Sequence, residues 1–115
     1  MLGGDRLDRV SELLRQEVSA LFEREVEVPP GVLATVTRVK VSPDLEHATV
    51  WLSVHPSSRA SEVFERLERV IGVLQQQLNR KLVMESVPRL RFIPDQGEDQ
   101  AARIEQLLDG LDGNR

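Results

Sequence analysis

The sequence predicts an α+β domain in which helices cover one face of a three-stranded sheet. Residues 6–25 and 58–82 each carry apolar side chains at three- and four-residue spacings, which is typical of amphipathic helices. Residues 48–55 alternate strictly between apolar and polar side chains, which is typical of a half-buried strand. A length of 115 residues suits one domain with one modest core.

The first helix is expected over residues 6–25. Its apolar stripe consists of Leu7, Val10, Leu13, Leu14, Val18, Leu21 and Phe22. Asp5 precedes this stripe and is a suitable N-cap, and Pro29-Pro30-Gly31 prevents the helix from continuing.

Two strands joined by a turn are expected next. Over residues 32–41 the alternation slips between Val36 and Val39, which indicates either a β-bulge or a strand that begins later than Val32. Ser42-Pro43-Asp44 supplies turn-forming residues. The second strand runs from Ala48 to the end of the alternation at residue 55. We expect an antiparallel hairpin with one buried face.

The second helix is expected from residue 58 to about residue 82, with Gly72 near its middle. Glycine costs roughly 1 kcal/mol relative to alanine inside a helix, so a kink or a close contact is expected there. A third strand is expected at residues 89–93, with Leu90 and Phe92 pointing inward. Because a long helix separates it from the hairpin, it should lie parallel to an earlier strand. A last short helix is expected over about residues 100–109.

The net charge of −4 is unusual for a protein that binds nucleic acid. Residues 95–115 hold six acids and two bases, so residues 1–94 are balanced, with 13 of each. We therefore predict a body at residues 1–95 and an acidic C-terminal helix and tail at residues 96–115. The solvated face of the sheet would carry Arg38, Lys40, Thr49, Trp51, Ser53, Arg89 and Arg91. This composition suits either solvent or a phosphate-rich partner.

No combination of residues indicates an active site. The absence of cysteine excludes thiolate metal sites and a thiol nucleophile. His47 and His55 would lie roughly 26 Å apart on one strand at about 3.3 Å per residue, which is too far for a catalytic or metal-binding pair. A nucleophile elbow and a glycine-rich phosphate loop are both missing. We expect no enzyme, cofactor or small-molecule substrate, and with no signal-like or membrane-spanning stretch we expect a cytoplasmic protein.

Three segments together resemble bacterial ribosome-binding factor A. They are residues 9–18 (RVSELLRQEV), residues 39–51 (VKVSPDLEHATVW), and Gly72-Val73-Leu74 followed by residues 87–95 (VPRLRFIPD). The resemblance implies a type II KH-like fold, α-β-β-α-kink-α-β, in which an Ala-x-Gly kink replaces the Gly-x-x-Gly RNA loop. Here the kink falls on Val70-Ile71-Gly72, with Val70 in place of alanine, and the helix after the glycine has Gln75 and Gln76 where an arginine is usual.

The resemblance also implies a non-catalytic, monomeric assembly factor that binds the immature small ribosomal subunit and its 16S rRNA during late maturation. Ten residues are the candidate RNA contacts: Arg6, Arg9, Arg38, Lys40, Arg69, Gly72, Arg80, Lys81, Arg89 and Arg91. Their basic side chains would contact phosphates and read the shape of the RNA rather than its base sequence.

Two alternatives remain open from the sequence. The acidic tail and the altered kink favour a KH-like protein-interaction domain with little RNA affinity. Trp51 would either stack on a base or pack under the terminal helix.

Overall fold

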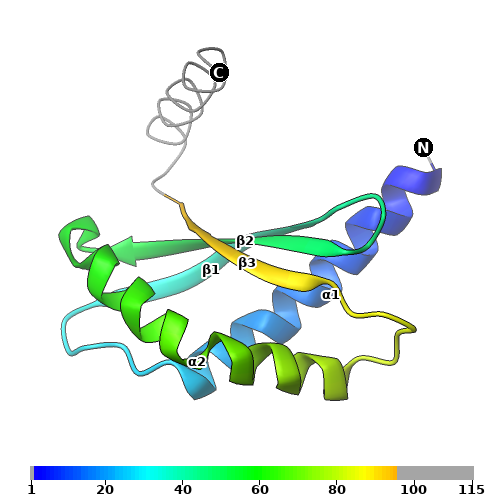
Figure 1. Ribbon diagram of the computed structural model, residues 1–115. Helices are drawn as coiled ribbons and strands as arrows, with labels where there is room; N and C mark the ends of the chain where they lie inside the picture. The colour runs from blue at the N-terminus through cyan, green and yellow to red at the C-terminus, as the bar shows by residue number, and fades with distance from the viewer. Residues whose placement is uncertain (1, 96–115) are drawn as a thin grey trace, which may run out of the picture.

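A computed structural model describes residues 2–95 of the chain (Figure 1). The elements are α1 (Leu2–Glu25), β1 (Leu33–Val41), β2 (His47–His55), a 3-10 turn η1 (Ser57–Arg59), α2 (Ala60–Lys81) and β3 (Arg89–Pro94). This order confirms the α+β fold class. The helix and tail expected within residues 96–115 lie outside the described residues. Neither α1 nor α2 is long and apolar enough to cross a membrane.

The three strands form one sheet in the order β1-β2-β3. β1 and β2 are antiparallel, and β3 lies parallel to β2, as the long helical connection predicted. The pairing of β1 with β2 shifts by one residue between Val36 and Arg38, so Thr37 is the extra residue of a β-bulge. The bulge therefore accounts for the slipped alternation, and β1 also begins one residue later than Val32, at Leu33.

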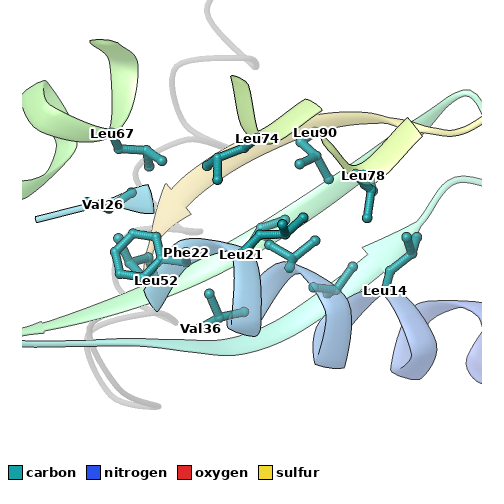
Figure 2. Close-up of a cluster of buried hydrophobic side chains, with 14 of the residues drawn as sticks. Leu14, Leu21, Phe22, Val26, Val36, Leu52, Leu67, Leu74, Leu78 and Leu90 are labelled. Carbon is teal, nitrogen blue, oxygen red and sulfur yellow. The ribbon is translucent and has the colours of Figure 1, made fainter. Parts of the chain in front are cut away.

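Both helices pack on the same face of the sheet (Figure 1). The inward side chains of the central strand β2 are all buried: Ala48, Val50, Leu52 and Val54. Figure 2 shows Leu21 and Phe22 of α1 beneath Leu74 of α2, in one hydrophobic cluster with Leu52 of the sheet. Fully burying such a side chain contributes about 1.5–3 kcal/mol, so this cluster is the main source of stability.

The beginning of α1 differs from its prediction. The helix starts at Leu2, four residues before the expected start, so the assignment of Asp5 as N-cap is wrong. The apolar periodicity begins at Leu7, but extending an existing helix by further residues costs little free energy. The periodicity alone therefore does not determine the first residue of α1.

The interruption expected at Gly72 is a bend within one helix. Hydrogen-bonded helix continues from Ala60 to Lys81, and Figure 1 shows α2 changing direction near its middle, where Gly72 lies in the sequence. Apart from its two chain neighbours and the adjacent backbone of α2, a Cβ atom on Gly72 would meet no atom within 4 Å. Of the two roles expected for Gly72, a kink and a close contact, the described residues therefore show the kink and not the close contact.

Candidate nucleic-acid interface

The strands of the sheet contain four basic side chains and no carboxylate. The basic residues are Arg38 and Lys40 in β1 and Arg89 and Arg91 in β3, and all four are exposed. The whole chain, by contrast, has a net charge of −4. Positive charge is therefore concentrated on the sheet of a chain that is acidic overall.

Strand pairing brings these side chains onto one face. Lys40 of β1 and Arg91 of β3 are both paired with Thr49 of β2, so the three form one row across the sheet. Arg38, Trp51 and Ile93 form the adjacent row. Neighbouring strands are about 4.8 Å apart, which places the backbones of Lys40 and Arg91 about 10 Å apart. We name the group Arg38, Lys40, Arg89 and Arg91 the open-face cations.

The bulge at Thr37 decides which face the β1 cations occupy. In a regular strand, Arg38 would point to the same side as Val36, which is buried under the helices. The extra residue reverses the alternation, so Val39 returns to the core with 6% exposure and Arg38 points outward with Lys40. One inserted residue thus converts two core-directed positions into positions on the open face.

Arg38 and Trp51 are in direct contact on this face. The guanidinium carbon of Arg38 lies 3.8 Å from the centroid of the Trp51 ring. Such a cation–π contact at an exposed site contributes about 0.5–1 kcal/mol. Trp51 is half-buried, so part of its ring remains accessible beside the basic side chains. Packing of Trp51 under a terminal helix would involve residues outside the described range and stays a prediction.

The open-face cations have no carboxylate partner among the side chains of residues 6–95. Ion pairs within that range are made instead by Arg15, Arg24, Arg59, Arg66 and Lys81. Asp8 and Glu12 of α1 line one surface pocket together with Arg38 and Lys40, but they form no ion pair with these two cations. A cation that is not ion-paired leaves its charge available to solvent or to an anionic ligand. The open face is therefore electrostatically suited to phosphate.

Acidic residues lie at the two ends of this face. Asp95 follows β3, and its carboxylate accepts a hydrogen bond from Thr37 Oγ1. Asp44 lies in the β1–β2 turn, where the Ser42 hydroxyl and the Glu46 backbone N–H donate to its carboxylate and lower its pKa below the ordinary value. Ligand atoms of Asp44, Glu46 and His47 lie within 4.8 Å of one another, but all three residues are exposed, as is common on surfaces without a metal.

The other six candidate contacts lie in the helices, which cover the opposite face of the sheet. Arg6 and Arg9 are in α1, Arg69 and Gly72 are near the middle of α2, and Arg80 and Lys81 are at its end. All six are exposed. Lys81 is also used internally, because its Nζ atom lies 3.1 Å from Glu17 Oε2 of α1. The structure thus divides the ten candidates into the open-face cations and a separate helical group.

The bend in α2 lacks an open surface of small residues. Val70 is half-buried and packs against the core cluster, and Ile71 is also half-buried. The branched side chain at residue 70 therefore serves packing. Gly72 is exposed, but it is the only one of Val70-Ile71-Gly72 that is.

Two comparisons of the sequence with known proteins point to one family. The family model described as ribosome-binding factor A matches residues 6–108. The chain is 35% identical to ribosome-binding factor A of Akkermansia muciniphila over 109 residues, which cover 95% of this chain and 86% of that protein.

Two structures share the fold. The crystal structure of ribosome-binding factor A from Thermus thermophilus has a TM-score of 0.64 at 22% identity, covering 76% of this chain and 93% of the other. A homology model of the Thermus thermophilus factor was fitted into a cryo-electron microscopy map of a 30S complex with that factor. It has a TM-score of 0.52 at 26% identity, and the match covers 70% of this chain and 90% of the other.

Proposed function

Because this chain belongs to the ribosome-binding factor A family, we propose that it binds the small ribosomal subunit during the late steps of that subunit's assembly. Its partner would be the 16S rRNA of the immature subunit, and it would act as a cytoplasmic monomer without catalysing a reaction. The similarity to the Thermus thermophilus factor, which was fitted into the map of a 30S complex, supports this partner.

The observation that carries the proposal is the open face of the sheet. Four cations lie in the two outer strands of a sheet that contains no carboxylate, and among residues 6–95 none of the four is ion-paired. Phosphate neutralisation by arginine and lysine releases counterions, which is the dominant source of sequence-independent affinity for nucleic acid. We propose that the open-face cations make the principal contacts to rRNA, and that the helical group contributes less.

A second function is favoured by the bend in α2. Because Val70 packs against the core cluster, the bend presents only Gly72 as a small exposed residue to the backbone of an RNA strand. A KH-like domain without RNA affinity would instead bind another protein. The two functions differ in their response to salt, because phosphate contacts weaken steeply as the salt concentration rises.

Co-sedimentation with purified immature small subunits tests the proposal. The double variant Arg9→Gln/Arg38→Gln removes one cation from each group and should bind more weakly, while circular dichroism shows an unchanged fold. The matched control is Arg15→Gln/Arg24→Gln, which removes two cations that are paired with neighbouring glutamates. Equal binding of the two double variants across a salt series would contradict the proposal, and salt-insensitive binding of the unmodified chain would favour the protein-interaction function.

A further inference from the structure

Trp51 occupies the centre of the open face. It is in the middle strand, with Arg38 opposite it on β1 and Ile93 opposite it on β3. The row of Lys40, Thr49 and Arg91 lies two residues further along, about 7 Å away. A half-buried aromatic ring is thus placed one row away from two cations, on a surface whose strands contain no acid.

We infer that Trp51 is a stacking site for one unpaired base of single-stranded RNA, with Lys40 and Arg91 binding the phosphates beside it. This inference rests on the proposed function and specifies which form of RNA the open face binds. Aromatic rings in basic surroundings are the usual means by which proteins hold unpaired bases. Bases within a duplex are stacked on each other and present no ring face to a flat sheet.

Arg38 covers the Trp51 ring in the RNA-free chain and is displaced when a base binds. Among the side chains of residues 6–95, Arg38 has no ion-pair partner, so this cation–π stack is the interaction that holds its guanidinium in place. An exposed stack of that kind favours the contact about 2- to 5-fold, whereas stacking of a base on an aromatic side chain raises affinity about 5- to 150-fold. The base therefore outcompetes the guanidinium, and Arg38 becomes available to a phosphate.

The chain provides its own probe for this site. Trp51 is its only tryptophan, and it has no tyrosine, so intrinsic fluorescence excited at the red edge reports this ring alone. The full chain is titrated with a short single-stranded oligouridylate and, in parallel, with an RNA duplex of similar length. We expect the single strand to quench Trp51 fluorescence and the duplex to leave it largely unchanged.

Two variants separate stacking from charge. Trp51→Leu keeps an apolar side chain but removes the ring, and should weaken oligouridylate binding about 5- to 150-fold in an anisotropy titration of labelled RNA. Trp51→Phe keeps a ring and should retain most of the affinity. Thermal unfolding of both variants checks that the sheet is intact.

The outcomes distinguish this inference from the proposed function. If the chain binds immature subunits and oligouridylate while Trp51 fluorescence and Trp51→Leu affinity stay unchanged, the stacking site is wrong and the proposed function stands. Equal quenching by duplex and single strand would also overturn it. A blue-shifted, RNA-insensitive emission would show that another part of the chain covers the ring, with the same consequence. If immature subunits are not bound at all, the proposed function itself fails.

Discussion

The backbone N–H of Leu90 in β3 donates a hydrogen bond of 2.8 Å to the side-chain Oε1 of Gln75 in α2. The Nε2 atom of the same side chain donates to the Pro88 carbonyl at 3.0 Å. Pro88 and Leu90 are both buried, so these two backbone groups have little access to water. Gln75 therefore satisfies the backbone where the chain enters β3, and holds this edge strand against the bent helix.

Replacing Gln75 should destabilise the fold. Gln75→Ala leaves a buried N–H and a buried carbonyl without their partner, which costs about 1–3 kcal/mol. Gln76→Ala is the matched control, because the neighbouring side chain is exposed. Urea unfolding of the two variants checks this, and equal midpoints would show that the Gln75 bonds do not stabilise β3.

A cavity at the centre of α2 should be more costly. Leu74 is fully buried, and Leu74→Ala should lower the free energy of unfolding by about 2–5 kcal/mol. Val73 is 41% exposed, so Val73→Ala should change it by less than about 1 kcal/mol. Thermal unfolding measures both, and a similar loss for the two variants would contradict the assignment of the buried face of α2.

Gly72 can be tested separately for stability and for RNA contact. A Cβ atom has room there and the helix is continuous, so Gly72→Ala should stabilise the fold by up to about 1 kcal/mol without weakening subunit binding. Gly31→Ala is the contrasting variant, because Gly31 has φ +81° and alanine is strained in that conformation. Loss of subunit binding in a stabilised Gly72→Ala chain would instead make the bend a contact.

The turn between β1 and β2 should make a small contribution to stability that depends on pH. Hydrogen bonds from the Ser42 hydroxyl and the Glu46 N–H lower the pKa of Asp44 in the folded chain. Because the pKa of Asp44 is lower in the folded chain than in the unfolded chain, its ionised carboxylate stabilises the fold at pH values above the unfolded pKa of about 3.9. This stabilisation is lost as the pH falls through the pKa of the folded chain.

Unfolding measured from pH 7 down to acid should therefore show a flatter decline for Asp44→Asn than for the unmodified chain. Glu46→Gln removes an equal charge from the same turn and serves as the control. If Glu46→Gln flattens the pH dependence of the free energy of unfolding as much as Asp44→Asn does, the effect arises from net charge rather than from the Asp44 hydrogen bonds.

The acidic residues of the C-terminal segment should oppose RNA binding. Residues 96–115 hold five acids and two bases, and their negative charge repels phosphate at long range. Changing Glu98, Asp99, Glu105 and Asp109 to their amides in the full chain should raise oligouridylate affinity, most strongly at low salt. An affinity that does not change at any salt concentration would mean that this segment has no electrostatic influence on the site.

Much of the fold could be predicted because the alternation of apolar and polar residues in the central strand shows which of its faces is buried. The alternation from Ala48 to Val54 identifies β2 and its buried face, and the helix between β2 and β3 requires their parallel pairing. The sequence alone could not show whether the slip in the first strand reflects a bulge or a later start of the strand, since both are compatible with the spacing of Val36 and Val39. The pairing of Arg38 with Trp51 decides it.

The candidate site was harder to predict, because it depends on register between strands that are distant in the sequence. Each of the ten residues could be named as basic or as part of the kink, but their division between two faces follows from the pairing of Lys40 and Arg91 with Thr49. The Arg38–Trp51 contact was missed for the same reason. A hairpin aligned with one bulged residue at Thr37 would have placed those two residues opposite each other.

The salt dependence of binding to immature small subunits tests the central claim most directly, namely that the open-face cations contact rRNA phosphates. Each phosphate contact contributes about 0.7–0.9 to the slope of log K against log salt concentration. Lys40→Gln/Arg91→Gln should therefore reduce the slope by roughly 1.5, while the helical pair Arg69→Gln/Arg80→Gln should reduce it by less than half as much. An unchanged slope for Lys40→Gln/Arg91→Gln, with a reduced slope for the helical pair, would contradict the account.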